Sequence, residues 1–432
     1  MNKEANHKNQ AFVDYPSLNT LLFFQRPRSF YRPILFSRNE VFCGPDCETK
    51  IEGNRFSTIN TPTGYFDVES IFHQLPASQK PELVIVKADA GRRVFPTNLD
   101  IFNCPKLLIC GDTHHLKEPL QTLIAYAKEQ QFDFIMSIPD PHHLHYFKES
   151  GFEKVFWIPT FHIDPHPQTP RNSYQHLISF VGQAGKFHPY RNYILRQVQK
   201  MGFPVNQLQA SRSEAAQIYA DSLITLNVSL NGDLNMRVFE VLSSGGFLLT
   251  DKLSKQARLD LVLEDGQHFV SYKNEIELQH HLNFFSNHPE AAKEIARKGK
   301  EQFWQNHRPE LNIKRVLDYI NGENIEPFCL AETDKRSIFI KKEAGTEENF
   351  QHRLQIYEYI LELHRLKTRL RGLFWQNVDP KIICDAVDLP RLDLHVFWDI
   401  SQNFSAASTL FQQCEVLQQI TFLHDSDLKR DN

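Results

Sequence analysis

The feature that most constrains the fold is an alternation of short apolar runs with amphipathic stretches. In the range 21–160, buried strands are predicted at 82–89 and 106–112. A proline-rich linker follows at 161–175, and the same alternation resumes over 176–324. Strands that alternate with helices are typical of a parallel sheet with helices on both faces. The pattern therefore predicts two successive α/β domains.

The length and the two ends of the chain set its further organisation. A chain of 432 residues is too long for one ordinary hydrophobic core, which agrees with two domains. Residues 1–20 are polar and are expected to be disordered. The range 325–432 differs from both domains, and 346–375 within it has apolar positions at helical spacing. We expect a mainly helical C-terminal extension.

The composition narrows the function classes. Lys and Arg total 48 and Asp and Glu total 52, so the formal net charge of −4 argues against a general nucleic-acid binder. The seven cysteines are too few and too scattered for a disulfide scaffold, and no Cys or His set has the spacing of a zinc site, so no metal is expected. The polar N-terminus and the lack of a long apolar run predict a cytoplasmic protein without a transmembrane segment, although peripheral contact with a membrane stays open.

The stretch GDLNMRVFEVLSSGGFLLTD, residues 232–251, combines a turn, a short helix and an apolar strand. On a helical wheel, the helix predicted at 235–244 has an apolar arc and a polar arc. The apolar arc consists of Val238, Phe239, Val241 and Leu242. The polar arc consists of Arg237, Glu240, Ser243 and Ser244.

The start of this helix is a candidate anion site. Asn235 is in the place of an N-cap, and the free N–H groups and partial positive charge of a helix start suit a pyrophosphate. Arg237 adds a forked cation for phosphate oxygens, and Glu240, one turn later, can accept both hydroxyls of a ribose. The alternative is an exposed ion pair between Arg237 and Glu240, because residues three apart often pair on a helix surface.

The stretch FVGQAGKFHPYR followed by LNMRVFEVLSSGGFLLTD resembles the carboxy-terminal half of group 1 glycosyltransferases, in particular the subgroup related to spore-maturation glycosyltransferases. The order of a strand ending in FVG, then N-x-R-x-F-E and G-x-x-L-L-T-D, supports the resemblance, which covers roughly 150–320. It implies the GT-B architecture, in which two Rossmann-like domains face a cleft and the second binds most of a nucleotide sugar. It also implies UDP as the nucleotide and a reaction without a metal cofactor.

The resemblance assigns roles to particular residues. Glu240 corresponds to the second glutamate of the family's E-x7-E motif and would hold the ribose. The first glutamate falls on Gly232, so this chain departs from the motif where the donor sugar would be contacted. Gly182, Lys186 and Arg191 would face the phosphates together with Asn235 and Arg237. A lone Lys186 could equally be a solvated surface lysine.

The segment GDTHH, residues 111–115, directly follows an apolar strand. Because the carboxyl ends of parallel strands point into the ligand crevice, Asp112, His114 and His115 are candidate catalytic residues. One of them could contact the donor sugar or deprotonate an acceptor hydroxyl. The alternative is a turn in which Asp112 caps a helix and the two histidines are solvated.

The expected function is therefore a metal-independent glycosyltransferase of the hexosyl or N-acetylhexosaminyl type. Its partners would be a nucleotide-sugar donor and a glycan, protein or small-molecule acceptor. Two alternatives stay open: a sugar-nucleotide epimerase on the same fold, and a catalytically silent scaffold that binds a partner through helix 346–375. That helix could also pack on the core, form a homodimer or present the acceptor.

Overall fold

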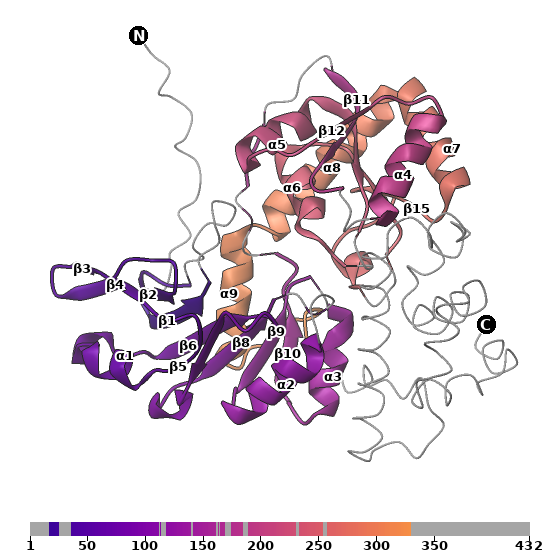
Figure 1. Cartoon of the computed structure of the whole chain (residues 1–432). Coiled ribbons are helices and arrows are strands. Elements are labelled where there is room, and N and C mark those ends of the chain that lie inside the picture. Colours follow the sequence, from indigo (N-terminus) through magenta and orange to yellow (C-terminus); the bar gives the residue numbers. More distant parts are fainter. Residues whose placement is uncertain are drawn as a thin grey trace, which may run out of the picture.

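The computed structural model describes part of the chain, and all structural statements refer to that part. It comprises residues 17–25, 36–111, 113, 118–139, 141–160, 163, 165–168, 174–184, 189–229, 233–253 and 257–329. Two parallel sheets, each flanked by helices, form two domains (Figure 1). The predicted α/β class and its division into two domains are confirmed. The predicted helix at 346–375 lies outside the described residues.

The first domain is built on an eight-stranded sheet in the order β10-β9-β8-β6-β1-β2-β4-β3. All its strand pairs are parallel except β3 with β4. The strands are β1 (Asn19–Phe24), β2 (Asn39–Gly44), β3 (Lys50–Glu52), β4 (Arg55–Asn60), β6 (Leu83–Ala88), β8 (Lys106–Cys110), β9 (Phe134–Ser137) and β10 (Val155–Trp157). From β1 the chain adds strands to one side through β2 and β4, then to the other side from β6 onward. The point of reversal therefore lies between β1 and β6.

Smaller elements complete the first domain. The strands β5 (Gly64–Asp67) and β7 (Val94–Thr97) form a separate parallel pair. The α-helices are α1 (Glu69–Gln74), α2 (Pro119–Glu129) and α3 (Leu144–Glu149). The 3-10 turns are η1 (Ala77–Gln79), η2 (Leu99–Ile101) and η3 (Pro141–His143). Because β1 begins at Asn19, the end of the stretch 1–20 that was predicted to be disordered is part of the central sheet.

The second domain has a five-stranded parallel sheet in the order β12-β11-β13-β14-β15. The strands are β11 (His176–Val181), β12 (Val205–Leu208), β13 (Ser222–Asn227), β14 (Leu248–Asp251) and β15 (Val270–Tyr272). The helices are α4 (Pro189–Lys200), α5 (Arg212–Ala220), α6 (Met236–Ser244), α7 (Glu275–Asn287) and α8 (Pro289–Asn306), with a 3-10 turn η5 (Leu259–Leu261). The strand order reverses between β11 and β13.

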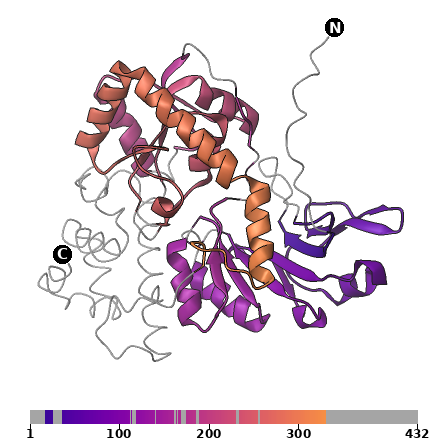
Figure 2. The same cartoon turned by 180° about the vertical axis from the view of Figure 1, so that it is seen from behind.

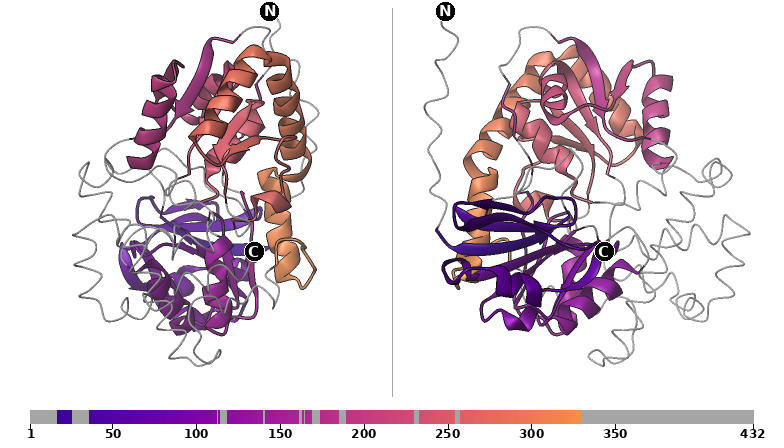
Figure 3. Two further views of the ribbon diagram at one scale, coloured as in Figure 1. Left: turned by 90° about the vertical axis from the view of Figure 1, so that its right-hand side faces the viewer. Right: turned by 60° about the vertical axis from the view of Figure 1, so that its left-hand side comes forward.

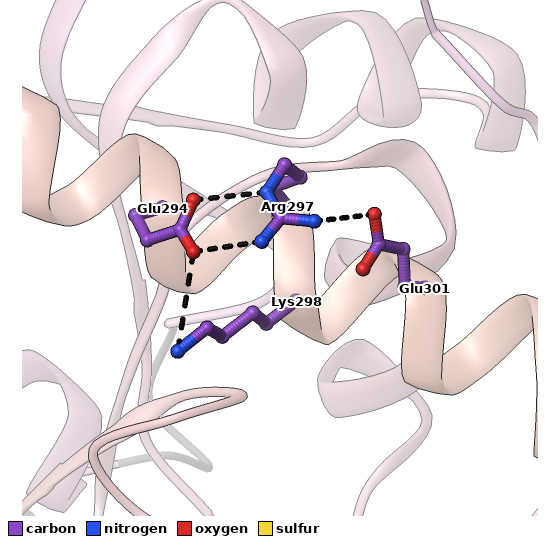
Figure 4. A network of polar contacts seen from close by, with 4 residues as sticks. All are labelled: Glu294, Arg297, Lys298 and Glu301. Atoms are coloured by element: carbon purple, nitrogen blue, oxygen red, sulfur yellow. Dashed lines mark hydrogen bonds and ion pairs between the residues drawn. The ribbon is translucent and has the colours of Figure 1, made fainter.

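Apolar side chains explain why these strands form. All six residues of β13 are buried, and in β6 only Lys87 is not. Strands covered by helices on both faces need such continuous apolar runs. The opposite pattern appears on α8, whose exposed face has a charge network. There, Arg297 binds Glu294 at 2.7 Å and Glu301 at 2.6 Å, and Lys298 lies 3.9 Å from Glu294 (Figure 4). Exposed pairs of this kind contribute little to stability.

The last described helix connects the domains in space. After α8, helix α9 (Pro309–Ile320) leaves the second domain and runs alongside the first (Figures 1 and 2). The ring of Tyr319 lies 4.6 Å from that of Phe156 in β10. Past α9, the carbonyl of Phe328 accepts a hydrogen bond of 3.0 Å from the backbone N–H of Trp157. Although α9 falls in the range predicted for the second domain, it packs on the first sheet, as the side views also show (Figure 3).

The bend between α8 and α9 is fixed by buried polar groups. His307 is 2% exposed, and its Nε2 lies 3.3 Å from the carbonyl oxygen of Val262. Burial lowers the pKa of His307 to about 4, so the ring is neutral at pH 7. The side chain of Asn312 donates to the carbonyl oxygens of Thr160 and His307. These contacts give His307 a structural role at the bend.

No helix in the described part of the chain combines the length and the apolar character needed to cross a membrane.

Candidate functional site

Polar side chains gather at the carboxyl ends of β11, β13 and β14, where the order of the second sheet reverses. Open α/β sheets bind ligands at this kind of crevice. Of the residues predicted to contact a nucleotide, the structure brings together Gly182, Arg191, Asn235, Arg237 and Glu240. Lys186 lies outside the described residues, as does Gly232.

Arg237 is held by the ends of two strands. Its Nε donates to the carbonyl oxygen of Val181 at 2.8 Å, and its Nη1 donates to Oδ1 of Asn227 at 2.7 Å. Its guanidinium also lies 4.5 Å from the ring centroid of Phe180. The contacts turn this side chain towards the strands rather than along the helix to Glu240. These hydrogen bonds of Arg237 are thus made to the strand ends, although its charge still acts on the carboxylate of Glu240.

Gly182 makes room for Arg237. Its φ is +142°, and a Cβ added there would lie 2.3 Å from Nη2 of Arg237. The loop that follows β11 can thus pass directly over the guanidinium only because residue 182 has no side chain. The glycine predicted to face a phosphate has a second, packing role.

Arg191, from α4, joins the loops that follow β11 and β13. Its Nε donates to the carbonyl oxygen of Val228 at 2.9 Å, and its Nη1 donates to that of Gln183 at 3.2 Å. Burial lowers its pKa to about 10, and the charge of Arg237 adds to the effect. At neutral pH it is still a cation, so Arg191 and Arg237 together give this crevice two positive charges.

A buried acid, which sequence reasoning did not single out, closes the network on the β14 side. Asp251 is 2% exposed, and its carboxylate accepts hydrogen bonds from the backbone N–H of Ser229 at 2.8 Å and from the Ser229 hydroxyl. Burial raises its pKa. Asn227 donates to Oγ1 of Thr250 at 2.9 Å, which links Arg237 to this acid. Asp251 could have been identified from the sequence because an acidic residue at the end of an apolar strand, as in FLLTD, indicates a candidate site residue.

The start of α6 brings the two domains together. Asn235 has the extended backbone of an N-cap, with φ −74° and ψ 159°, as predicted. Its side chain makes no cap hydrogen bond, and both of its polar atoms are buried without a partner among the described residues. Next to it, the N–H of Leu234 donates to the carbonyl oxygen of Pro139 in the first domain at 3.0 Å. The helix start therefore lies at the boundary between the domains.

Glu240 lies one turn into α6 and is partly exposed. Burial raises its pKa, while the charges of Arg212, Arg237 and His166 oppose the rise. A carboxylate among three basic groups can stay ionised and accept hydrogen bonds.

The rest of the polar arc predicted for α6 needs correction. Ser243 and Ser244 are 2% and 1% exposed, and their hydroxyls donate to the carbonyl oxygens of Glu240 and Val241, both at 2.8 Å. Serine hydroxyls can be buried in a helix once they bond to the preceding turn. The accessible part of the polar face thus narrows to Arg237 and Glu240.

The candidate catalytic residues Asp112, His114 and His115 lie outside the described residues, but Thr113 between them does not. Oγ1 of Thr113 lies 2.7 Å from Nδ1 of His143, and both side chains are buried. His143, after β9, therefore holds Thr113, a residue that the sequence did not single out.

Comparison with known proteins identifies part of the chain. Residues 190–318 match the model of a family described as glycosyl transferase-like. A search among curated protein sequences gave no match.

Several solved structures resemble part of the chain. TarM from S. aureus has 14% identity and a TM-score of 0.45, with 59% of this chain and 57% of TarM covered. Sucrose-phosphate synthase from Thermosynechococcus elongatus has 11% identity and a TM-score of 0.46 over 70% of this chain and 98% of that one. A glycosyltransferase from Rickettsia africae has 8% identity and a TM-score of 0.49 over 72% and 100%. The chain thus spans little more than half the length of TarM, and these weak likenesses assign neither substrate nor activity.

The matched range begins in α4 and ends in α9, so it contains Arg191, Arg237, Glu240 and Asp251. Two α/β domains, with the last helix returning from the second to the first, are the arrangement that the resemblance to group 1 glycosyltransferases implies. Residues 190–318 are therefore similar to the family described as glycosyl transferase-like, and the rest of the chain lies outside that match.

Proposed function

We propose that this protein is a glycosyltransferase that moves a sugar from a UDP-sugar to an acceptor hydroxyl or other nucleophile. The observation that supports this most strongly is the position of Glu240 and Arg237. Both lie at the strand-order reversal of the second sheet, on the helix whose start meets the first domain, and inside the range that matches a glycosyl transferase-like family.

The donor would lie across the carboxyl ends of β11 and β13. Glu240 accepts hydrogen bonds from the two ribose hydroxyls. The diphosphate lies at the start of α6, where the N–H groups and the side chain of Asn235 are available to oxygens. Arg237 and Arg191 contribute positive charge there mainly through space, because several of their N–H groups already bind backbone and Asn227 oxygens.

In the reaction, the bond between the anomeric carbon and the diphosphate oxygen breaks, and its electron pair leaves with the diphosphate. The acceptor oxygen forms the new bond and loses its proton to a base. Positive charge at the start of α6 stabilises the negative charge that develops on the leaving group. We assign the base, or the contact near the reacting carbon, to Asp112, His114 or His115, the neighbours in sequence of Thr113, which lies against His143. No metal cofactor is required in this scheme.

Calorimetric titration of the full chain with UDP, GDP and dTDP tests the donor site. We expect UDP to bind and the Glu240→Ala variant to bind it at least about tenfold more weakly, because two hydrogen bonds to the ribose are lost. Glu323→Ala removes an exposed carboxylate near the end of α9 and serves as the matched control, with unchanged affinity. A folded protein that binds none of the three nucleotides would contradict the proposal and favour the silent scaffold.

A further inference from the structure

A cavity of about 710 Å³ lies at the outer edge of the second sheet, outside the groups that the proposed reaction uses. It is bounded by β15, which is the edge strand, by α7 and by the first turns of α8 (Figure 1). Its volume is in the range of small-molecule sites, roughly 300–1,000 Å³. The chemistry of its lining therefore decides which class of molecule it can take.

The floor of the cavity is apolar and consists of Val270, Phe285, Ala291 and Ile295. Val270 and Phe285 are 6% and 4% exposed and belong to the core of the second domain. Phe284 lines the cavity beside them and is 41% exposed. Its ring stacks on that of His288 at 4.4 Å with 19° between the planes, which holds it in place. The floor can therefore cover an apolar face of a ligand.

The rim of the cavity is polar and consists of Lys252, Lys273, Asp265, Glu277, His280 and His281. Its two ammonium groups and two carboxylates balance in charge. Burial lowers the pKa of His281, so that ring is neutral at pH 7. Among the described residues, neither ammonium group has a hydrogen-bond or ion-pair partner. The rim thus offers hydrogen-bond donors and acceptors together, without a net field.

The sheet brings the two lysines together. Lys252 directly follows β14, and Lys273 directly follows β15. The last residues of these strands, Asp251 and Tyr272, pair in register, and the N–H of Lys252 donates to the carbonyl oxygen of Tyr272 at 2.9 Å. Since Asp251 belongs to the polar network around Arg237, the cavity begins one residue beyond the candidate donor site, on the same edge of the sheet.

Two other classes of ligand do not match this lining. A peptide that adds a strand needs the open edge of β15, but Asp265 already accepts a 2.9 Å hydrogen bond from the N–H of Ser271, the middle residue of that strand. A polyanion needs an excess of positive charge, which the balanced rim does not supply.

We propose that this cavity binds an uncharged sugar ring of the acceptor glycan, away from the hydroxyl that reacts. A sugar ring has two apolar C–H faces and a rim of hydroxyls that both donate and accept hydrogen bonds, which matches an apolar floor and a mixed polar rim. The proposed function enters only where this saccharide is called the acceptor. Because neighbouring strands are about 4.8 Å apart, β15 lies roughly 10 Å from β13 and the donor, within reach of a glycan of a few rings.

The test is a titration of the full chain with uncharged trisaccharides, followed by saturation-transfer difference NMR. The probes are trisaccharides of glucose, galactose, mannose and N-acetylglucosamine, each added to the protein alone and to protein saturated with UDP. We expect at least one of them to bind, with the same Kd in both conditions. Phe284→Ala and Lys273→Met should each raise that Kd at least about fivefold.

Matched controls separate the cavity from the rest of the surface. Ile276→Ala removes a side chain of α7 that is 80% exposed and does not line the cavity. Lys200→Met removes an exposed cation at the end of α4, and both controls should leave the Kd unchanged. Circular dichroism shows whether each variant is folded. Phe284→Tyr keeps the aromatic ring and most of the affinity, so it keeps the test informative if Phe284→Ala does not fold.

The outcomes separate this site from the donor site. If none of the four trisaccharides binds, or if Phe284→Ala and Lys273→Met bind as tightly as the wild type, the site is refuted. If UDP or Glu240→Ala abolishes the binding, the saccharide occupies the donor crevice and the assignment to the cavity is overturned. If UDP itself does not bind, the proposed function fails, while the titration of the protein alone still tests the cavity.

Discussion

The two sheets each end in polar groups at a point of strand-order reversal, but they treat these groups differently. In the second domain, Arg237 and Arg191 donate to the carbonyl oxygens of Val181, Val228 and Gln183, so their charges are held in place by the fold. In the first domain, Nζ of Lys87 lies 4.7 Å from the centroid of the Phe24 ring, and burial lowers the pKa of this lysine to about 8. The comparison indicates that hydrogen bonds hold the cations of the second crevice in place, whereas in the first crevice burial disfavours the charged form of Lys87.

The largest expected effect tests how tightly the second crevice is packed. Gly182→Ala places a Cβ 2.3 Å from Nη2 of Arg237 at a φ of +142°. We expect the free energy of unfolding to fall by about 3 kcal/mol, measured by urea denaturation, because both the backbone and the guanidinium must move. Gly322→Ala is the matched control: its φ is +91°, and a Cβ there meets no atom within 4 Å. It should lose only about 1 kcal/mol. Equal losses would mean that Arg237 does not depend on the loop.

A smaller loss should follow from replacing the fork of Arg237. Lysine keeps the charge in Arg237→Lys but has one donor nitrogen in place of the two, Nε and Nη1, that bind Val181 and Asn227. We expect a loss of roughly 2 kcal/mol in the free energy of unfolding. Arg196→Lys, at an exposed position of α4, should leave stability unchanged. An Arg237→Lys variant with the same free energy of unfolding as the wild type would show that the positive charge is enough and that the two separate hydrogen bonds are not needed.

Lys87 should behave in the opposite way. Because burial lowers the pKa of Lys87 to about 8, Lys87→Met should raise the free energy of unfolding at pH 7 by about 1 kcal/mol. Lys50→Met at an exposed position is the control. If Lys87→Met destabilises the protein, the charged Lys87 is as well accommodated as Arg237 and Arg191, and the contrast between the two crevices disappears.

The pH dependence gives the finest test of the same contrast. The pKa of Lys87 is about 8 in the folded protein, against an ordinary value of 10.5. Between these values the unfolded chain binds more protons than the folded one, so this lysine makes stability rise with pH. The stability advantage of Lys87→Met over wild type should therefore be largest below pH 8 and shrink towards pH 10.5. A constant difference across this range would mean that the pKa of Lys87 is ordinary.

Much of the fold could be predicted because apolar runs alternate with amphipathic stretches along the sequence, and apolar runs are the segments that become buried strands. The strand predicted at 106–112 is β8, and the helix predicted at 235–244 is α6. The sequence did not predict the individual strands before residue 68. All three residues of β3 are exposed and β4 has a single buried residue, so neither forms an apolar run.

The candidate site was predictable in its residues and less so in its contacts. A helical wheel places Arg237 and Glu240 on one face, but it cannot show that Arg237 reaches back to Val181, which is distant in sequence. It also misplaced Ser243, because burial against α8 depends on the tertiary structure: Nε1 of Trp304 donates to the carbonyl oxygen of Ser243 at 3.0 Å. For the same reason, the sequence could not show that the charge of Arg212 acts on Lys87 in the other domain.

The central claim is that α6 binds a UDP-sugar, and a crystal structure of the full chain with UDP tests it most directly. The account predicts that the ribose hydroxyls bind the carboxylate of Glu240 and that the diphosphate lies at the start of α6, beside Asn235 and Arg237. A UDP molecule bound elsewhere, with Glu240 free of the ribose, would contradict it.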